Sequence, residues 1–191
     1  MRNRGIFFAT FAKKQLVMKH LVVSVFIMVA LFATSVQAQQ DKSKRPSPPK
    51  LTEGTIDGVG IKIDYSAPSA KGRKMIGGIE KYGEVWRTGA NEATVFVIDK
   101  AAKIEGQTLA AGKYELFSIP GESEWTIIFQ KFGAKGQWGA YDYNQKNDAL
   151  RVKVKAGKPS EFVETFTFVI ENGHVVFKWE NVQVGFSVTK G

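Results

Sequence analysis

The residues best suited to chemistry gather in one short stretch, Tyr82 to Thr94, which reads Tyr-Gly-Glu-Val-Trp-Arg-Thr-Gly-Ala-Asn-Glu-Ala-Thr. Arg87 offers a planar set of donors, Asn91 offers both a donor and an acceptor, and Glu92 accepts hydrogen bonds. With Trp86 as an apolar platform, these side chains could hold a small polar ligand such as a sugar or a carboxylate. The alternative is an internal salt bridge between Arg87 and Glu92, with Asn91 bonded to backbone groups of the loop.

A long segment without strand character, residues 68–83, runs directly into this stretch. Loops longer than about 12 residues in compact domains are usually functional or disordered, and we expect this one to lie beside or over Trp86 and Arg87. Basic side chains of this segment, and an aromatic one from a second irregular segment, would then form the rim of the site. The candidate ligand-binding residues are Trp86, Arg87, Asn91, Glu92, Arg73, Lys74 and Trp138.

Several other chemistries are excluded by composition. The chain has no cysteine, which rules out disulfides, a thiol nucleophile and cysteine-ligated zinc. One of its two histidines, His20, lies in the N-terminal leader, so a catalytic triad would have to use His174 and no two-histidine metal site can form. We therefore assign no catalytic residue, metal ligand or cofactor. A hydrolase with Glu92 or Glu84 as its acid–base stays open, because glycoside hydrolysis needs only a carboxylate pair. The carboxylates available for such a pair are Glu84, Glu92, Asp64 and Glu80.

Residues 1–38 have the features of a secretory signal peptide. Leu21 to Ala33 is an uncharged, mostly apolar run, and Val36-Gln37-Ala38 supplies the small residues that a signal peptidase recognises. The run is too short for a spanning helix, which takes about 20 apolar residues. We expect a periplasmic or extracellular protein with no stable membrane span after cleavage. Met18 is an alternative start, because Met18-Lys19-His20 already forms a basic beginning.

Removal of the leader changes the charge of the protein. The whole chain has 27 basic and 18 acidic residues and a formal net charge of +9. Five of the basic residues and none of the acidic ones lie in residues 1–38, which leaves +4 for the mature chain. A charge of this size is ordinary for a soluble domain and does not indicate nucleic-acid binding.

The rest of the chain is dominated by the alternation of apolar and polar residues that is typical of β-strands. Residues 39–50 are rich in proline and lysine and are expected to form an extended tether. A single domain of about eight strands follows over residues 51–191, and Asn172-Gly173 is its strongest hairpin signal. The expected fold is an all-β, antiparallel two-sheet sandwich or jelly roll, with a closed barrel as the alternative. The expected strands cover residues 59–65, 93–99, 113–119, 125–130, 151–155, 162–171, 175–180 and 182–188.

Two stretches, Ile63 to Lys74 and Val85 to Thr94, carry a resemblance to a known family. The similarity continues through Ala111 to Tyr114, Ile119 to Gly121, Glu124 to Phe129 and Trp138-Gly139. From about Gly58 to Phe168 the chain resembles the DUF2911 family, a bacterial family of unknown function. The resemblance implies a family and an exported context. It implies no activity, because the family has no established catalytic or binding residues.

These features predict an exported binding module of the cell envelope for a small polar or glycan-like ligand. Two alternatives remain. One is a metal-independent hydrolase, and the other is a structural or interaction protein of the envelope in which residues 82–94 only stabilise the fold.

Overall fold

The computed structural model describes residues 41–191, so the expected signal peptide, residues 1–38, and the alternative start expected at Met18 lie outside the described residues. Residues 42–191 form one compact unit. Its strands are all antiparallel, and in this part of the chain the only helical elements are the 3-10 turns η2 (Lys42–Lys44) and η3 (Gln145–Asn147). Across residues 41–191, no helix is long and apolar enough to cross a membrane.

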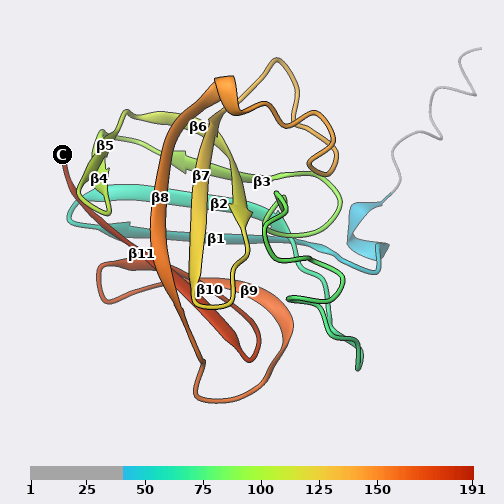
Figure 1. The fold of residues 1–191 in the computed structure, drawn as a ribbon. Coiled ribbons are helices and arrows are strands. Elements are labelled where there is room, and N and C mark those ends of the chain that lie inside the picture. The colour runs from blue at the N-terminus through green and yellow to red at the C-terminus, as the bar shows by residue number, and fades with distance from the viewer. Residues whose placement is uncertain (1–40) are drawn as a thin grey trace, which may run out of the picture. The chain divides into compact units, whose positions relative to one another are not determined.

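Eleven strands join into one sheet that nearly closes on itself (Figure 1). They are β1 Pro49–Ile56, β2 Val59–Ser66, β3 Thr94–Ile98, β4 Ala102–Ile104, β5 Gln107–Leu109, β6 Gly112–Ile119, β7 Glu124–Lys131, β8 Asp148–Gly157, β9 Val163–Glu171, β10 His174–Glu180 and β11 Val182–Lys190. The order is β1-β2-β3-β6-β7-β8-β11-β10-β9, and off this path β4 pairs with β11 and β5 pairs with β4. The two end strands, β1 and β9, contact each other, and Thr52 Oγ1 donates to the carbonyl of Phe168 over 3.1 Å. The result is an almost closed barrel.

The expected all-β, antiparallel class is confirmed, but the two-sheet sandwich of about eight strands is not. Each of the eight expected segments contains a strand. β8 and β11 pair at Gln183↔Gly157 and Val184↔Ala156, and this pairing joins strands that a sandwich would divide between two layers. The three additional strands are β1, most of whose residues are exposed or half-buried, and the three-residue strands β4 and β5.

Three tight hairpins share one backbone geometry. Asn172 and Gly173 between β9 and β10 have φ angles of 51° and 75°, as a type I′ turn requires. Asp57-Gly58 and Glu105-Gly106 repeat the pattern, with φ angles of 49° and 75° and of 47° and 78°. The hairpin expected at Asn172-Gly173 is therefore confirmed.

Aromatic side chains fill the barrel. Trp86 stacks on Trp179, with ring centroids 5.8 Å apart and planes inclined by 16°. Trp125, Phe166 and Phe177 meet Trp86 edge-on, and all five side chains are buried. Aromatic pairs of this kind contribute about 0.5–1.5 kcal/mol each beyond the burial of their area. The aromatic residues of the strands form the core.

The long segment 68–83 packs against the end of β10. Met75 and Ile76 are buried, and their backbone N–H groups donate to the two carboxylate oxygens of Glu180 over 3.0 and 2.9 Å. Ile76 lines the same small internal void as Trp86. The segment therefore lies beside Trp86, as its place in the sequence predicted.

Replacement of Glu180 by alanine is expected to lower the free energy of unfolding by about 2 kcal/mol, because two half-enclosed backbone donors lose a charged acceptor. The left-handed φ of 52° at Glu180 is about equally unfavourable for alanine and for glutamate, so backbone strain does not change the difference in stability. Urea unfolding followed by circular dichroism measures the loss, and amide exchange at Met75 and Ile76 locates it. Glu171→Ala is the matched control. It removes a more exposed carboxylate of the same hairpin that pairs with Lys178, and should cost less than about 1 kcal/mol. Equal losses in the two variants would contradict the role given to Glu180.

Candidate functional site

The indole of Trp86 holds the turn that follows it. Its Nε1 donates to the carbonyl of Gly89 over 3.0 Å, in a buried hydrogen bond. Gly89 is tightly enclosed, since a Cβ at this position would lie 3.0 Å from Thr94 Oγ1 and 3.1 Å from the Ser66 carbonyl oxygen. A larger residue would push the turn off the barrel, so the close approach requires glycine.

Two residues of the same turn adopt left-handed backbone conformations. Thr88 has φ 52° and Asn91 has φ 59°, which is common for asparagine and unfavourable for a β-branched residue. Thr88 is fully buried. Its hydroxyl donates to Ser118 Oγ over 2.9 Å, and its carbonyl accepts the Thr94 hydroxyl over 2.7 Å. These bonds hold the strained turn, from which Asn91 and Glu92 emerge half-buried.

The carboxylate of Glu92 binds two cations from residues 42–48, a segment that we call the strap. Arg45 Nη1 donates to Oε1 and Oε2 over 3.0 and 2.9 Å, and Lys42 Nζ lies 3.0 Å from Oε1. Burial by itself would raise the pKa of Glu92. The hydrogen bonds from Arg45, from a backbone N–H and from Lys42 outweigh burial and lower this pKa below its ordinary value. The proline-rich segment that was expected to be a tether thus supplies charged groups to the site.

Asn91 and Trp138 complete the surface on which the strap lies. Asn91 Nδ2 donates to the carbonyl of Ser47 over 3.0 Å. The guanidinium carbon of Arg45 lies 5.8 Å from the centroid of the Trp138 ring, which is within cation–π range. Trp138 stands opposite Glu92 in an isolated antiparallel bridge and keeps 56% of its surface exposed. Asn91, Glu92 and Trp138 are called the strap surface below.

A buried carboxylate, Glu115 of β6, fastens the loop that carries Trp138. Glu115 has no exposed surface. It accepts the backbone N–H of Gln137 over 2.7 Å and also the side-chain amide of Gln137. The same amide donates to Gln130 Oε1 over 2.6 Å, and the Gln137 carbonyl accepts the N–H of Ala93 over 2.9 Å. The loop is therefore tied both to the barrel and to the turn that presents Glu92.

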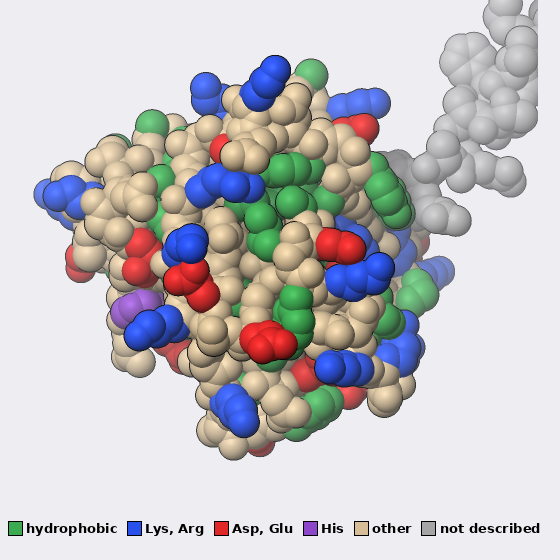
Figure 2. Space-filling model, viewed as in Figure 1, with side chains coloured by type: hydrophobic (Ala, Val, Ile, Leu, Met, Phe, Trp, Pro, Cys, Tyr) green, Lys and Arg blue, Asp and Glu red, His purple; other side chains and the backbone are tan. Residues whose placement is uncertain are grey.

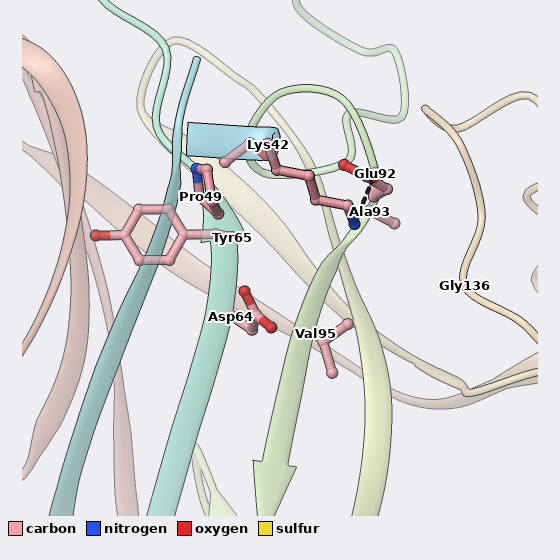
Figure 3. A pocket seen from close by; sticks show the side chains of 9 residues that line it. Lys42, Pro49, Asp64, Tyr65, Glu92, Ala93, Val95 and Gly136 are labelled. Atoms are coloured by element: carbon pink, nitrogen blue, oxygen red, sulfur yellow. Dashed lines mark ion pairs between the residues drawn. The ribbon is translucent and has the colours of Figure 1, made fainter. Parts of the chain in front are cut away.

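A cavity of about 270 Å³ opens beside the Lys42–Glu92 ion pair. Figure 3 shows Asp64 and Val95 projecting from the neighbouring strands β2 and β3, with the ion pair at one end. Asp64 forms no ion pair with any residue of the described chain. On the face drawn in Figure 2, basic and acidic side chains are interspersed. Within residues 41–191, no group of three or more histidine, aspartate or glutamate side chains could hold a metal ion. The lining of the cavity includes Lys42, Asp64, Tyr65, Glu92, Val95 and Gly136.

The seven residues expected to form one site lie in different places. Asn91, Glu92 and Trp138 come together at the strap surface, and of the seven only Glu92 lines the cavity. Trp86 is a core residue with 3% of its surface exposed. The two basic residues of the expected rim, Arg73 and Lys74, are exposed. Arg73 donates hydrogen bonds to two carbonyls of its own loop, those of Ala70 and Ser69, both over 2.9 Å.

Arg87 has a different electrostatic neighbour from the one considered in the sequence. Burial raises the pKa of Glu80, and the positive charge of Arg87 partly opposes this rise. The Nε of Arg87 is buried and has no hydrogen-bond partner in the described chain. Glu92 pairs with the strap instead, so the proposed salt bridge between Arg87 and Glu92 is not formed. Asn91 does bond a backbone group, the Ser47 carbonyl.

Sequence reasoning missed the strap cations and Glu115. Arg45 lies 47 residues before Glu92 in a proline-rich segment without strand periodicity, and no local pattern links the two. Glu115 did leave a signal, because it is a charged residue between Tyr114 and Leu116 in the middle of a strand. A charge at such a position is seldom buried without a dedicated partner.

Substitution of Trp86 by alanine is expected to cost about 3–5 kcal/mol of stability, since it leaves a large cavity in the core. The matched control is Trp138→Ala, which removes the same side chain from an exposed position and should change stability by about 0.5 kcal/mol or less. Chemical denaturation followed by far-ultraviolet circular dichroism gives both values. A mild effect at Trp86 would show that its indole is not part of the core.

Acid is expected to weaken the attachment of the strap. Because the pKa of Glu92 is lowered in the folded protein, its contribution to stability is present above the ordinary glutamate pKa of about 4.3 and is lost as the pH falls through the lowered value. Arg45→Ala should raise the Glu92 pKa, as measured by NMR of the side-chain carboxyl carbon. Arg73→Ala, an arginine that bonds only its own loop in the described chain, should leave it unchanged. An unaltered pKa in Arg45→Ala would contradict the assignment.

Comparison with known proteins places this chain in a family. A family model described as "Protein of unknown function (DUF2911)" matches residues 47–188. No curated protein and no solved structure matches the chain. The matched range includes Asn91, Glu92 and Trp138 and begins after Arg45. Since the family model covers well over half of the sequence, the chain belongs to the DUF2911 family.

Proposed function

We propose that the protein is an exported binding module of the cell envelope that holds a small, hydroxyl-rich ligand, such as a sugar, in the cavity between Asp64 and Glu92. The observation that carries the proposal is this cavity of about 270 Å³, which combines polar and apolar lining groups. Ligand sites commonly measure about 300–1,000 Å³, so this one suits a ligand at the small end of the range. The leader-like residues 1–38 support export.

Asp64 is the polar group best able to orient the ligand. Its side chain is exposed, forms no ion pair with another described residue and projects from β2 into the cavity, beside Val95 of the paired strand β3 (Figure 3). An ionised carboxylate only accepts hydrogen bonds, and it therefore selects ligands that present hydroxyl or ammonium donors. Lys42 Nζ, held by Glu92 at the other end, supplies the complementary donor.

Exposed aromatic side chains nearby favour a glycan-like ligand. Trp138 is 56% exposed and Tyr141, in the same loop, is 85% exposed, whereas the strand aromatics are buried. Trp138 is positioned by its bridge to Glu92, which itself lines the cavity. The face of an aromatic ring offers a platform for the apolar face of a sugar ring.

Binding is favoured over hydrolysis by the state of the carboxylates. Asp64 and Glu92 share one cavity, as a pair of catalytic carboxylates would. A glycosidase, however, needs one carboxyl group whose pKa is raised so that it can act as an acid. The pKa of Glu92 is lowered by the strap, so Glu92 is unsuited to be that acid, and its carboxylate is already paired with Lys42 and Arg45.

Asp64→Asn is expected to weaken ligand binding at least ten-fold, because it replaces one carboxylate acceptor with a donor at nearly unchanged volume. Thermal melting against a panel of monosaccharides, oligosaccharides and peptidoglycan fragments gives the readout. A ligand at about 100 times its dissociation constant stabilises the folded protein by roughly 2.7 kcal/mol. Asp57→Asn makes the same chemical change at the turn of the same hairpin, away from the cavity, and should keep wild-type shifts. The proposal fails if nothing in the panel shifts the wild-type melting temperature, or if the two variants respond alike.

A further inference from the structure

The strap is held in the manner of a bound peptide. Two of its carbonyls accept hydrogen bonds from the barrel unit, Ser47 from Asn91 Nδ2 over 3.0 Å and Pro48 from the N–H of Ala67 over 2.9 Å. Its arginine enters a site made of a carboxylate and an exposed indole. Proteins that recognise extended peptides commonly bind the peptide main chain through hydrogen bonds, which give affinity. They bind selected side chains in separate sites, which give specificity.

The strap is also weakly anchored. None of residues 42–50 is buried, so the strap places no apolar side chain in the core. The side chains of Lys42 and Glu92 are 59% and 36% exposed, and an exposed ion pair of this kind contributes only about 0–1 kcal/mol. Arg45, with 22% of its side chain exposed, makes the stronger contact, and its partner Glu92 is open to solvent on one side. A segment attached in this way can be displaced by another that makes the same contacts.

The two sides of the contact differ in their relation to the family. Asn91, Glu92 and Trp138 lie inside the range matched by the family model, residues 47–188, and Lys42 and Arg45 lie outside it. The strap surface is thus part of the family domain. Its cationic occupant belongs to the flanking segment.

We propose that Asn91, Glu92 and Trp138 form a recognition site for a basic, arginine-bearing peptide segment of a partner protein, and that the strap is its resident occupant. The guanidinium of the partner takes the place of Arg45 between the Glu92 carboxylate and the Trp138 ring. Asn91 binds a carbonyl two residues further along the partner peptide, as it does at Ser47. The inference concerns the strap surface beside the cavity and does not depend on a polar ligand in that cavity.

Attachment in the same chain gives the strap an advantage over any free peptide. A short tether produces an effective concentration in the millimolar range, and a competing peptide must overcome it. Removal of the two strap cations frees Glu92 and Trp138 from their intramolecular partners and so weakens this competition, while the backbone contacts at Ser47 and Pro48 remain. The strap variant, and not the wild type, therefore reports the affinity of the surface.

The test uses residues 39–191, which contain the whole compact unit Lys42–Gly191, and a fluorescein-labelled Lys-Ser-Lys-Arg-Pro-Ser-Pro peptide, the sequence of residues 42–48. Fluorescence anisotropy is expected to show saturable binding to Lys42→Ala/Arg45→Ala, at least ten-fold tighter than to the wild type. Addition of Glu92→Gln should weaken this binding at least ten-fold. An equivalent Glu124→Gln, at an exposed carboxylate that pairs with Lys153, should have no effect. A peptide with alanine in place of its arginine should bind at least ten-fold more weakly.

Three results would overturn the proposal. In the first, the peptide does not bind the strap variant at millimolar concentration. In the second, Glu92→Gln leaves the binding unaffected. In the third, the peptide binds the wild type and the strap variant equally. Thermal melts of each variant verify that the barrel is intact. If the peptide fails to bind but ligands still shift the melting temperature in the Asp64 experiment, only the peptide site is refuted. If the peptide binds but no ligand shifts the melting temperature, only the polar-ligand cavity is refuted.

Discussion

The position of Trp86 is the constraint on which both the core and the surface site depend. Its ring stacks on Trp179 inside the barrel, and its Nε1 ties the carbonyl of Gly89. The chain must then reverse within a few residues to enter β3 at Thr94, which forces left-handed conformations at Thr88 and Asn91. This reversal brings Glu92 out of the barrel. The packing of one indole in the core therefore decides where a surface carboxylate stands.

The same turn explains why two charges close in sequence do not pair. The backbone reverses direction between Arg87 and Glu92. Each side chain therefore interacts with an opposite charge from another segment of the chain. Arg87 acts on Glu80 of the long segment 68–83, and Glu92 binds Arg45 of the strap. The short sequence separation of an ion pair is an advantage only where the backbone leaves both side chains on one side. Here the hydrogen-bonded turn takes precedence, because buried backbone and hydroxyl groups cost more when unpaired than an exposed ion pair contributes.

The sequence was sufficient to predict eight of the eleven strands and insufficient to predict how they close. Alternation at Val59, Ile61 and Ile63 and the dipeptide Asn172-Gly173 are local signals, and the structure confirms them. Closure depends instead on the pairing of β8 with β11 and on contact between β1 and β9, which join residues far apart in the chain. The site divides in the same way. Glu92 and Trp138 were both expected at the site, but the bridge that sets Trp138 opposite Glu92 joins distant segments and has no local signal in the sequence.

Proline accounts for the way in which the strap meets the barrel. Pro46, Pro48 and Pro49 have no backbone N–H to donate, so regular pairing of β1 with β2 begins at Pro49↔Ser66 and cannot extend as a full ladder along the strap. The carbonyls of the strap can still accept hydrogen bonds. Their donors are the Ala67 N–H and Asn91 Nδ2. With one half of the ladder missing, side-chain contacts add to the attachment, among them the ion pairs of Lys42 and Arg45 with Glu92 and the contact of Arg45 with the Trp138 ring. An edge closed by prolines and charge also resists indiscriminate strand addition, so a partner would have to carry the arginine in order to bind.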